Sequence, residues 1–413
     1  MDSFRFVHAS DLHLDSPLIG LSQKSLEYAQ KVEQASRTAF DNLITLTIEE
    51  RCKMLVLGGD LFDGEWRDFR TGLFFASRMR RLDEAGIQVF AVLGNHDAEN
   101  EFTSRLKLSS NVHLFSASVA ESRKVEGIDA VVHGRSFPRR DVTENLADSY
   151  PVPHADCFNI GVLHTACSGR DGHASYAPCT VEQLVNHGYQ YWALGHVHAR
   201  EVLSREPYVV FPGNLQARHP REAGPKGATL VTVTAGAIAR VEHRVLDVIR
   251  WAYELVDVNC ANTRDEVVRV LRDRIASAYE AADGRGLALR LAVTGRTACH
   301  DELVTKGAAF REELETVLES IAGDIWLEKL ELRTGSPERA DAVDPTMVGP
   351  ILSAIDGFAD GEPYDAALKE TLAKLRAQLP SSARLDELEE RLRPDLRDRA
   401  RRLARSVVEL GQE

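Results

Sequence analysis

A short apolar segment that ends in two glycines and an aspartate constrains the fold of this chain more than any other feature. Residues 54–57 are Met, Leu, Val and Leu, and Gly58, Gly59 and Asp60 follow directly. Such a run is typical of a strand in a parallel sheet that is covered on both faces. Ligands bind at the carboxyl ends of strands in open α/β sheets, so the segment predicts an α/β fold with Asp60 at a site. Taken alone, Gly-Gly-Asp also fits a turn that caps a helix.

Four other segments repeat this design, with polar side chains directly after an expected strand. Asp11 and His13 follow a strand that begins at Phe4, and their spacing of two places both side chains on one side of extended backbone. Alone, this pair is equally compatible with a capping aspartate beside an uninvolved histidine. The other expected strands are 88–93, 158–163 and 191–194.

Seven potential metal ligands therefore lie at the ends of five expected strands: Asp11, His13, Asp60, Asn95, His164, His196 and His198. Three oxygen donors and four imidazoles exceed what one ion needs. They suit two ions with one carboxylate between them.

The order of these motifs resembles the calcineurin-like metallophosphoesterases over about the first 245 residues. The motifs are Asp-x-His, Gly-Gly-Asp, Gly-Asn-His-Asp, a lone His and Gly-His-x-His. Residues 213–219, together with 222–227, are most similar to the YhaO type within the SbcD/YhaO branch of DNA-repair exonucleases. The resemblance implies an α/β fold, a layered β-sandwich flanked by helices.

The same resemblance implies two ligand sets that share Asp60, with Mn²⁺ as the usual ion. The first ion would be held by Asp11, His13, Asp60 and His198, and the second by Asp60, Asn95, His164 and His196.

His96 would remain outside the coordination sphere, where it stabilises the transition state or protonates the leaving oxygen. Asp63 occupies the position at which phosphatase relatives carry an aspartate that orients this histidine, whereas repair nucleases of archaea and eukaryotes usually have a histidine there. Whether Asp63 orients His96 or helps to steer DNA stays open at this point. Two cations that clamp a phosphate lower the pKa of a bound water, and a positioned histidine supplies a proton, so the residue types suit phosphodiester hydrolysis.

The chain is expected to have three parts. Residues 1–248 form the nuclease domain, 249–335 form a small β-α-β-α-β domain, and 336–413 form a helical region. The order and size of the middle part resemble the α+β capping domain of SbcD-like nucleases. In those relatives the C-terminal region binds the coiled coil of an SbcC-like ATPase, whereas the simpler interpretation here is a solvated helical tail.

The net charge of -13 argues against a protein that coats nucleic acid by bulk charge. Arg218 and His219 are the candidate substrate contacts, and DNA affinity is expected to depend largely on homodimerisation or on the ATPase partner. Six scattered cysteines, an N-terminal strand where a signal peptide would lie, and no apolar run of membrane-spanning length predict a cytoplasmic protein that does not enter membranes.

The predicted function is that of a dinuclear metal-dependent DNA nuclease that acts in DNA repair. Exonuclease activity is the primary prediction, and endonuclease activity is a secondary one. A phosphodiesterase or phosphatase for small molecules or phosphoproteins is the second prediction, because the metal core does not choose a substrate. A non-catalytic scaffold subunit of an ATPase complex is the third. The presence of all seven ligands and of His96 argues against this last alternative.

Overall fold

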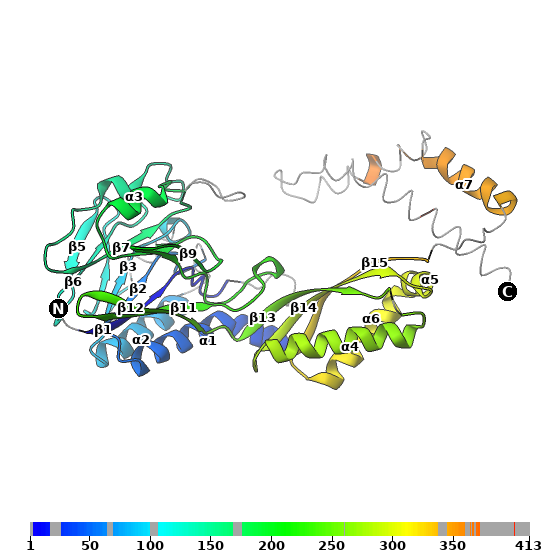
Figure 1. Ribbon diagram of the computed structural model, residues 1–413, viewed down its shortest axis with the longest axis horizontal. Helices are drawn as coiled ribbons and strands as arrows, with labels where there is room; N and C mark the ends of the chain where they lie inside the picture. The colour runs from blue at the N-terminus through cyan, green and yellow to red at the C-terminus, as the bar shows by residue number, and fades with distance from the viewer. Residues whose placement is uncertain are drawn as a thin grey trace. The chain divides into compact units, whose positions relative to one another are not determined.

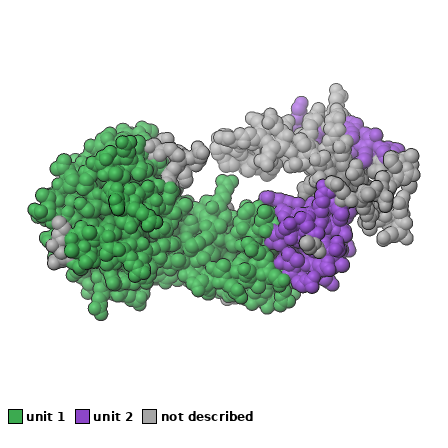
Figure 2. All heavy atoms as spheres, in the orientation of Figure 1, with its two compact units in different colours: residues 1–255, 272–292, 315–331 green, residues 256–271, 293–314, 332–413 purple. Residues whose placement is uncertain are grey.

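The computed structural model describes residues 3–16, 26–63, 69–99, 106–167, 176–259, 261–337 and 345–359, and a few single positions beyond them. The chain divides into two compact units (Figure 2). One unit holds residues 1–255, 272–292 and 315–331, and the other holds 256–271, 293–314 and 332–413. This division passes through the expected capping domain, so the boundaries at 248 and 335 stay predictions.

Two six-stranded sheets form the core of the first unit. The first sheet has the order β12 (Ala237–Val245), β11 (Gly227–Thr234), β1 (Phe4–Ala9), β2 (Met54–Leu57), β3 (Gln88–Ala91) and β4 (Val112–Leu114). The second has the order β5 (Glu121–Lys124), β6 (Ala130–Gly134), β7 (Phe158–His164), β8 (Tyr191–Gly195), β10 (Tyr208–Phe211) and β9 (Glu201–Arg205).

The strands that carry the expected ligands are parallel within each sheet. Strand β1 pairs with β2 and β2 with β3, all parallel, and β7 pairs with β8 in the same way. Each group therefore delivers its carboxyl ends to one edge of its sheet. The apolar segments 228–233 and 238–245 predict a hairpin around Ala235 and Gly236, and it is confirmed, since β11 and β12 are antiparallel neighbours.

Helices cover the outer faces of both sheets in unit 1 (Figure 1). Helices α1 (Leu26–Glu49) and α2 (Arg70–Glu84) run along the first sheet, and α3 (Val181–Asn186) lies on the second, against β9 and β10. Short 3-10 turns occupy Asp97–Glu99, Leu146–Ser149 and Pro220–Glu222. The predicted layered α/β sandwich flanked by helices is thus confirmed.

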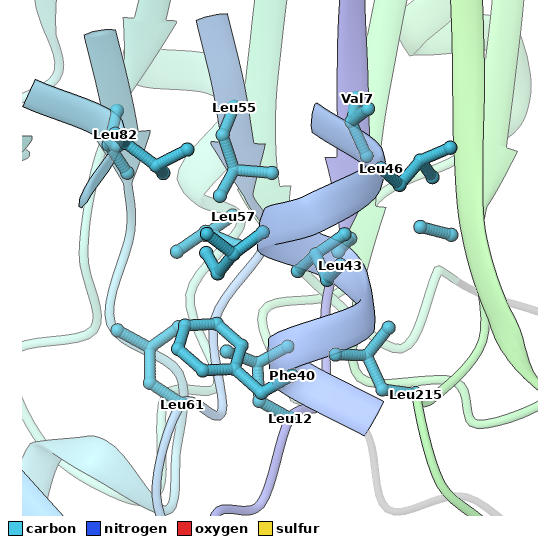
Figure 3. Close-up of a cluster of buried hydrophobic side chains, with 14 of the residues drawn as sticks. Val7, Leu12, Phe40, Leu43, Leu46, Leu55, Leu57, Leu61, Leu82 and Leu215 are labelled. Atoms are coloured by element: carbon cyan, nitrogen blue, oxygen red, sulfur yellow. The ribbon is translucent and has the colours of Figure 1, made fainter. Parts of the chain in front are cut away.

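The apolar side chains of α1 explain why that helix forms and where it packs. Ala39, Phe40, Leu43 and Ile44 recur at helical spacing, and all four are fully buried. They meet side chains from the first sheet and α2, such as Leu55, in one cluster (Figure 3). A second cluster fills the space between the two sheets, including Phe6, Val56, Val162 and Tyr191. Because β2 is buried on both faces, its continuous apolar run is explained.

A three-stranded sheet follows the sandwich in the chain. Its order is β13 (Ile249–Asp257), β14 (Gly286–Arg296) and β15 (Ile325–Gly335), with α4 (Arg264–Ala281), α5 (His300–Thr305) and α6 (Gly307–Ile321) between the strands. The expected β-α-β-α-β order is confirmed, except that α5 was not anticipated. The sequence predicts the second helix of this part over about 310–321, whereas α6 begins three residues earlier, at Gly307.

Beyond Gly335, the described residues contain helix α7 (Pro345–Ala359), which was expected only as part of a general helical region. The mixture of apolar and charged positions also predicts helices over 368–379 and 385–408. Residues 369–371 and 400 are helical, and the rest of both ranges lies outside the described residues. Within the part of the chain that the structure describes, no helix has both the length and the apolar character needed to cross a membrane.

Candidate metal centre

The expected ligands lie in loops directly after their strands, and backbone contacts join the loops. The Asp11 amide donates to the Gly59 carbonyl at 2.9 Å, and the His13 amide donates to the Asp60 carbonyl at 3.0 Å. Asp11, His13, Asp60 and His196 have φ angles of 53°, 40°, 51° and 102°, in the left-handed region that residues other than glycine rarely adopt. Backbone strain of this kind clusters at functional sites, where the surrounding structure holds it in place.

Two glycines allow the ligand loops to approach this closely. A Cβ on Gly94 would lie 2.3 Å from Asp60 Oδ1, and a Cβ on Gly195 would lie 2.0 Å from the Gly58 carbonyl oxygen. Both distances are far below van der Waals contact. The glycines of the Gly-Asn-His-Asp and Gly-His-x-His motifs therefore serve close packing of the loops.

One end of the centre brings acceptor atoms together around His164. Its Nδ1 lies 2.9 Å from the Gly58 carbonyl, which can only accept, so Nδ1 carries the hydrogen. The lone pair on Nε2 then faces Asn95 Oδ1 at 3.0 Å and Asp60 Oδ2 at 3.6 Å. Three electron-rich atoms that face one another without a proton between them fit a bound cation.

The other end repeats this arrangement around two histidines. His198 Nδ1 donates to the Glu222 carboxylate at 2.6 Å, which leaves its Nε2 as a lone pair. His13 Nδ1 lies 3.3 Å from Asp63 Oδ1, so a hydrogen on Nδ1 is favoured there too. The two Nε2 atoms are 3.1 Å apart, and His13 Nε2 is 3.7 Å from Asp60 Oδ2. A cation between these atoms would remove the repulsion of the lone pairs.

The two carboxylates of the centre are almost completely buried, with Asp11 at 1% and Asp60 at 2% exposure. Burial, with the negative charges of Asp97 and Asp11 nearby, raises the pKa of Asp60 well above its ordinary value. Burial also raises the pKa of Asp11, although His198 opposes this. Charged carboxylates at these positions need nearby positive charge, which divalent cations would supply.

Distances divide the potential ligands into three overlapping groups, in each of which one donor atom per residue lies within 4.8 Å of the others. The groups are Asp11, His13 and His198; Asp60, His164 and His196; and His13, Asp60 and His96. With Asn95 beside His164, the structure brings all seven expected ligands together. The first two groups correspond to the two expected ion sites, and they fit two ions with Asp60 beside both.

His96 lies at the edge of this centre, with 31% of its side chain exposed. Its amide donates to Asp60 Oδ1 at 3.0 Å, and its Nδ1 lies 3.4 Å from Asp63 Oδ1. Burial lowers the pKa of His96, and the negative charge of Asp63 opposes this shift. The ring packs edge-on to His13, with 5.0 Å between ring centroids.

Asp63 connects several groups of the site through one carboxylate. Oδ1 lies 3.1 Å from Arg218 Nη1, in addition to its contacts with His13 and His96, and Oδ2 accepts from Ser16 Oγ at 2.8 Å. Burial alone would raise the pKa of Asp63, but His13 and Arg218 outweigh it and hold the pKa well below its usual range. Asp63 is therefore an anion that faces both the buried ligands and His96.

The two candidate substrate contacts lie beside the centre. Arg218 has 20% of its side chain exposed and is engaged with Asp63, while His219 Nε2 lies 3.3 Å from Glu222 Oε1. Both neighbour the ligands, and their contact with substrate stays a prediction.

Sequence reasoning gave no role to two buried carboxylates. Asp97 accepts hydrogen bonds from the amides of Leu61, Phe62 and Gly94 at 2.9–3.0 Å, and so ties the Asp60 loop to the Asn95 loop. Burial raises its pKa to about 6. Glu222, 8% exposed, binds His198. Asp97 could have been noticed because it completes the Gly-Asn-His-Asp motif, whereas Glu222 follows His198 by 24 residues without a spacing signal.

Comparison with protein families agrees with this geometry. Residues 4–200 match the family described as calcineurin-like phosphoesterase. Residues 251–335 match the family described as metallophosphoesterase YhaO, middle domain, and thus cover most of β13, all of β14 and β15, and the helices between them.

Among curated relatives, the uncharacterized metallophosphoesterase YhaO of Bacillus subtilis is 35% identical, over 83% of this chain and 85% of that protein. The DNA double-strand break repair protein Mre11 of Methanopyrus kandleri is 25% identical, over 87% of this chain and 84% of the relative. Among solved structures, TT1561 of Thermus thermophilus is 14% identical, with a TM-score of 0.34. The match covers 58% of this chain and 98% of the TT1561 chain.

Proposed function

This chain belongs to the calcineurin-like metallophosphoesterases, in their YhaO family, and from that premise we propose that it is a manganese-dependent DNA nuclease. It would hydrolyse phosphodiester bonds in DNA repair, primarily as an exonuclease and secondarily as an endonuclease. The observation that carries the proposal is the convergence of carboxylate, imidazole and amide ligand atoms around Asp60, with His96 beside them.

The choice of DNA as the substrate is supported by the extent of the similarity. One relative named as a DNA double-strand break repair protein, that of Methanopyrus kandleri, aligns with 87% of this chain. That alignment is too long to be confined to residues 4–200, which match the general phosphoesterase family. A protein that shared only the metal core with this relative would align over much less of its length.

The residues of the centre divide the work of hydrolysis. Asp11, His13, Asp60 and His198 would hold one cation, and Asp60, Asn95, His164 and His196 would hold the other. When bound, two such cations supply positive charge to the phosphate oxygens and lower the pKa of water. From the edge of the centre, His96 would donate a proton to the leaving oxygen or stabilise charge on the phosphate. Asp63 orients the His96 ring through Nδ1.

A phosphodiesterase for small molecules is the second candidate, favoured by the net charge of -13. A strongly acidic protein repels the DNA backbone at long range, whereas a small monoester or diester reaches the centre at little electrostatic cost. The two candidates share the metal chemistry and differ only in how the substrate is recognised.

One assay separates them. Purified protein with Mn²⁺ is offered end-labelled single-stranded DNA, end-labelled double-stranded DNA and bis-p-nitrophenyl phosphate, with the Asp60→Asn variant as the inactive control. We expect cleavage of DNA and of the small diester, both lost in the variant. If the protein hydrolyses the small diester but leaves DNA uncleaved, the nuclease proposal is rejected in favour of the small-molecule phosphodiesterase.

The C-terminal region is the proposed docking site for an SbcC-like coiled-coil ATPase. In helix α7, the apolar side chains of Ile351 and Phe358 are 40% and 57% exposed. Exposed apolar residues on one helix support a partner that covers them. A homodimer, which would add a second set of DNA contacts, belongs to the same proposal.

A further inference from the structure

We infer that Glu222 is a positioning residue for the metal ligand His198, and that it selects the ring tautomer in which Nε2 is free to bind a cation. The inference deepens the proposed function but rests only on metal binding by the centre, not on DNA as the substrate. It assigns a role to a carboxylate that contacts no reacting atom.

The contact between the two side chains is short and its polarity is unambiguous. Glu222 Oε1 lies 2.6 Å from His198 Nδ1, and a carboxylate can only accept. Nδ1 must therefore carry a hydrogen. The other ring nitrogen, Nε2, faces His13 Nε2 at 3.1 Å and Asp11 Oδ1 at 3.7 Å, among the atoms that would hold the first cation.

The carboxylate is itself held in place on its second oxygen. Glu222 Oε2 accepts from Asn214 Nδ2 at 2.9 Å and from the Arg218 amide at 2.7 Å. Asn214 is fully buried. Because two donors fix Oε2, Oε1 is held towards the His198 ring at 2.6 Å, with His219 Nε2 farther away at 3.3 Å. This arrangement orients a ligand through its outer nitrogen, as hydrogen-bond partners of metal-binding histidines commonly do.

The backbone of the ligand loop is fixed by the same segment. Lys226 Nζ donates to the His198 carbonyl at 2.8 Å, and the Asn214 amide donates to that carbonyl at 3.4 Å. The segment from Asn214 to Lys226 thus holds both the ring and the main chain of His198. A loop distant in sequence therefore determines how well the first cation is bound.

The Glu222→Gln substitution tests this because a glutamine cannot satisfy both sides. If its oxygen faces Asn214 and the Arg218 amide, its NH₂ group faces His198 Nδ1, which must then accept, so the hydrogen moves to Nε2. If its oxygen faces His198, the NH₂ group meets two donors. Either outcome disturbs the ligand while preserving the size of the side chain.

The first measurement is an NMR experiment that determines the tautomer of the His198 ring in the wild type and in Glu222→Gln. Histidine-selective ¹⁵N labelling in metal-free protein, with His198 identified by comparison with His198→Gln, reports which ring nitrogen carries hydrogen. We expect a protonated Nδ1 in the wild type and a shift towards protonated Nε2 in Glu222→Gln. A neutral wild-type ring with hydrogen on Nε2 would overturn the inference, whether or not the variant folds.

The second measurement is calorimetric titration with Mn²⁺, which needs no substrate. We expect Glu222→Gln to bind one ion about 10- to 100-fold more weakly and the other as before. The matched control is Glu121→Gln, because Glu121 makes a comparable contact with His113 at 3.0 Å on β5, a strand that carries no ligand. Unchanged affinity in Glu222→Gln, or an equal loss in Glu121→Gln, would refute the role. Neither result bears on the nuclease proposal, which the DNA cleavage assay tests separately.

Discussion

Asp63 Oδ1 lies 3.4 Å from His96 Nδ1, so the carboxylate that faces the buried ligand His13 also faces the histidine at the edge of the centre. Position 63 carries a charge that can orient the His96 ring. This geometry favours the orienting role over DNA steering, because the carboxylate is already engaged by His96, His13 and Arg218.

The first prediction concerns His96→Asn. It should lower the rate by about 10²- to 10⁴-fold, because the positioned proton donor is lost, while both ions stay bound. Steady-state kinetics and Mn²⁺ titration measure the two effects separately. His96 also lies within 4.8 Å of donor atoms of His13 and Asp60. Recovery of activity at high Mn²⁺, or loss of an ion, would therefore show that His96 is a ligand.

Asp63→Asn should give a milder form of the same rate defect, because the ring keeps its position but loses its orienting charge. Asp41→Asn is the control, since Asp41 pairs with Arg78 at 2.7 Å on the helices behind the first sheet. An equal defect in both variants would mean that Asp63 acts only through general stability.

The second prediction is that the centre binds two ions and that Asp60 matters most to both. Asp60→Ala should lower the amount of bound metal more than any other single ligand change, because donor atoms from both groups lie beside its carboxylate. His164→Asn should weaken only the second ion, and added Mn²⁺ should restore part of the activity. Elemental analysis of loaded protein checks the stoichiometry, and a wild-type content of one ion would reject the dinuclear centre.

The third prediction tests the close packing of the ligand loops. Gly195→Ala places a Cβ 2.0 Å from a backbone oxygen, so we expect a loss of about 1–3 kcal/mol in the free energy of unfolding and weaker metal binding. Urea unfolding measures the first effect. Gly323→Ala is the control, because a Cβ there meets no heavy atom within 4 Å. Similar losses for the two variants would contradict the steric explanation.

The fourth prediction concerns pH and His8, which is fully buried between the sheets. Its Nε2 donates to the Leu194 carbonyl at 3.1 Å, and its Nδ1 accepts from the Tyr191 hydroxyl at 3.0 Å. Burial lowers its pKa from 6.5 to about 3. Above pH 6.5 the ring is neutral in both the folded and unfolded chains, so stability does not depend on it. As pH falls below 6.5, only the unfolded chain gains the proton, and stability is lost.

His8→Gln should therefore flatten the dependence of unfolding free energy on pH between 6.5 and 5, by at most about 1.4 kcal/mol per pH unit. Urea unfolding of metal-free protein at several pH values measures the slope. The slope comparison is independent of any constant destabilisation by the variant. Parallel curves for variant and wild type would contradict a neutral, buried His8.

The fifth prediction concerns the ATPase partner. Replacing Ile351 and Phe358 of α7 by glutamate should reduce co-purification with an SbcC-like partner, because charge on an apolar contact surface opposes association. Deletion of residues 336–413 should abolish it, and hydrolysis of the small diester should continue in both proteins. Exposed Val119 on the sandwich provides the control substitution, Val119→Glu. Full co-purification after the deletion would exclude this docking site.

Local features of the sequence were enough to identify the main strands of the core and the residues of the metal centre. Apolar runs, glycines and the polar residue at each strand end are such features, and they record secondary structure directly. Parallel pairing then brings Asp11, Asp60 and Asn95 to one edge whatever the details of packing. The short, less apolar strands β4, β5 and β9 left no such signal and were missed.

The orientation of the ligands, in contrast, depends on contacts that exist only in the folded chain. Glu222 meets His198 across 24 residues of sequence, and Arg218 meets Asp63 across 155. Hydrogen bonds of this kind depend on distances of a few tenths of an ångström and on the direction of a lone pair, whereas sequence spacing predicts only which edge of a sheet a residue reaches. The residues that the fold brings together at the candidate centre could therefore be recognised in the sequence, while the residues that hold them in position became visible only once the loops were folded together.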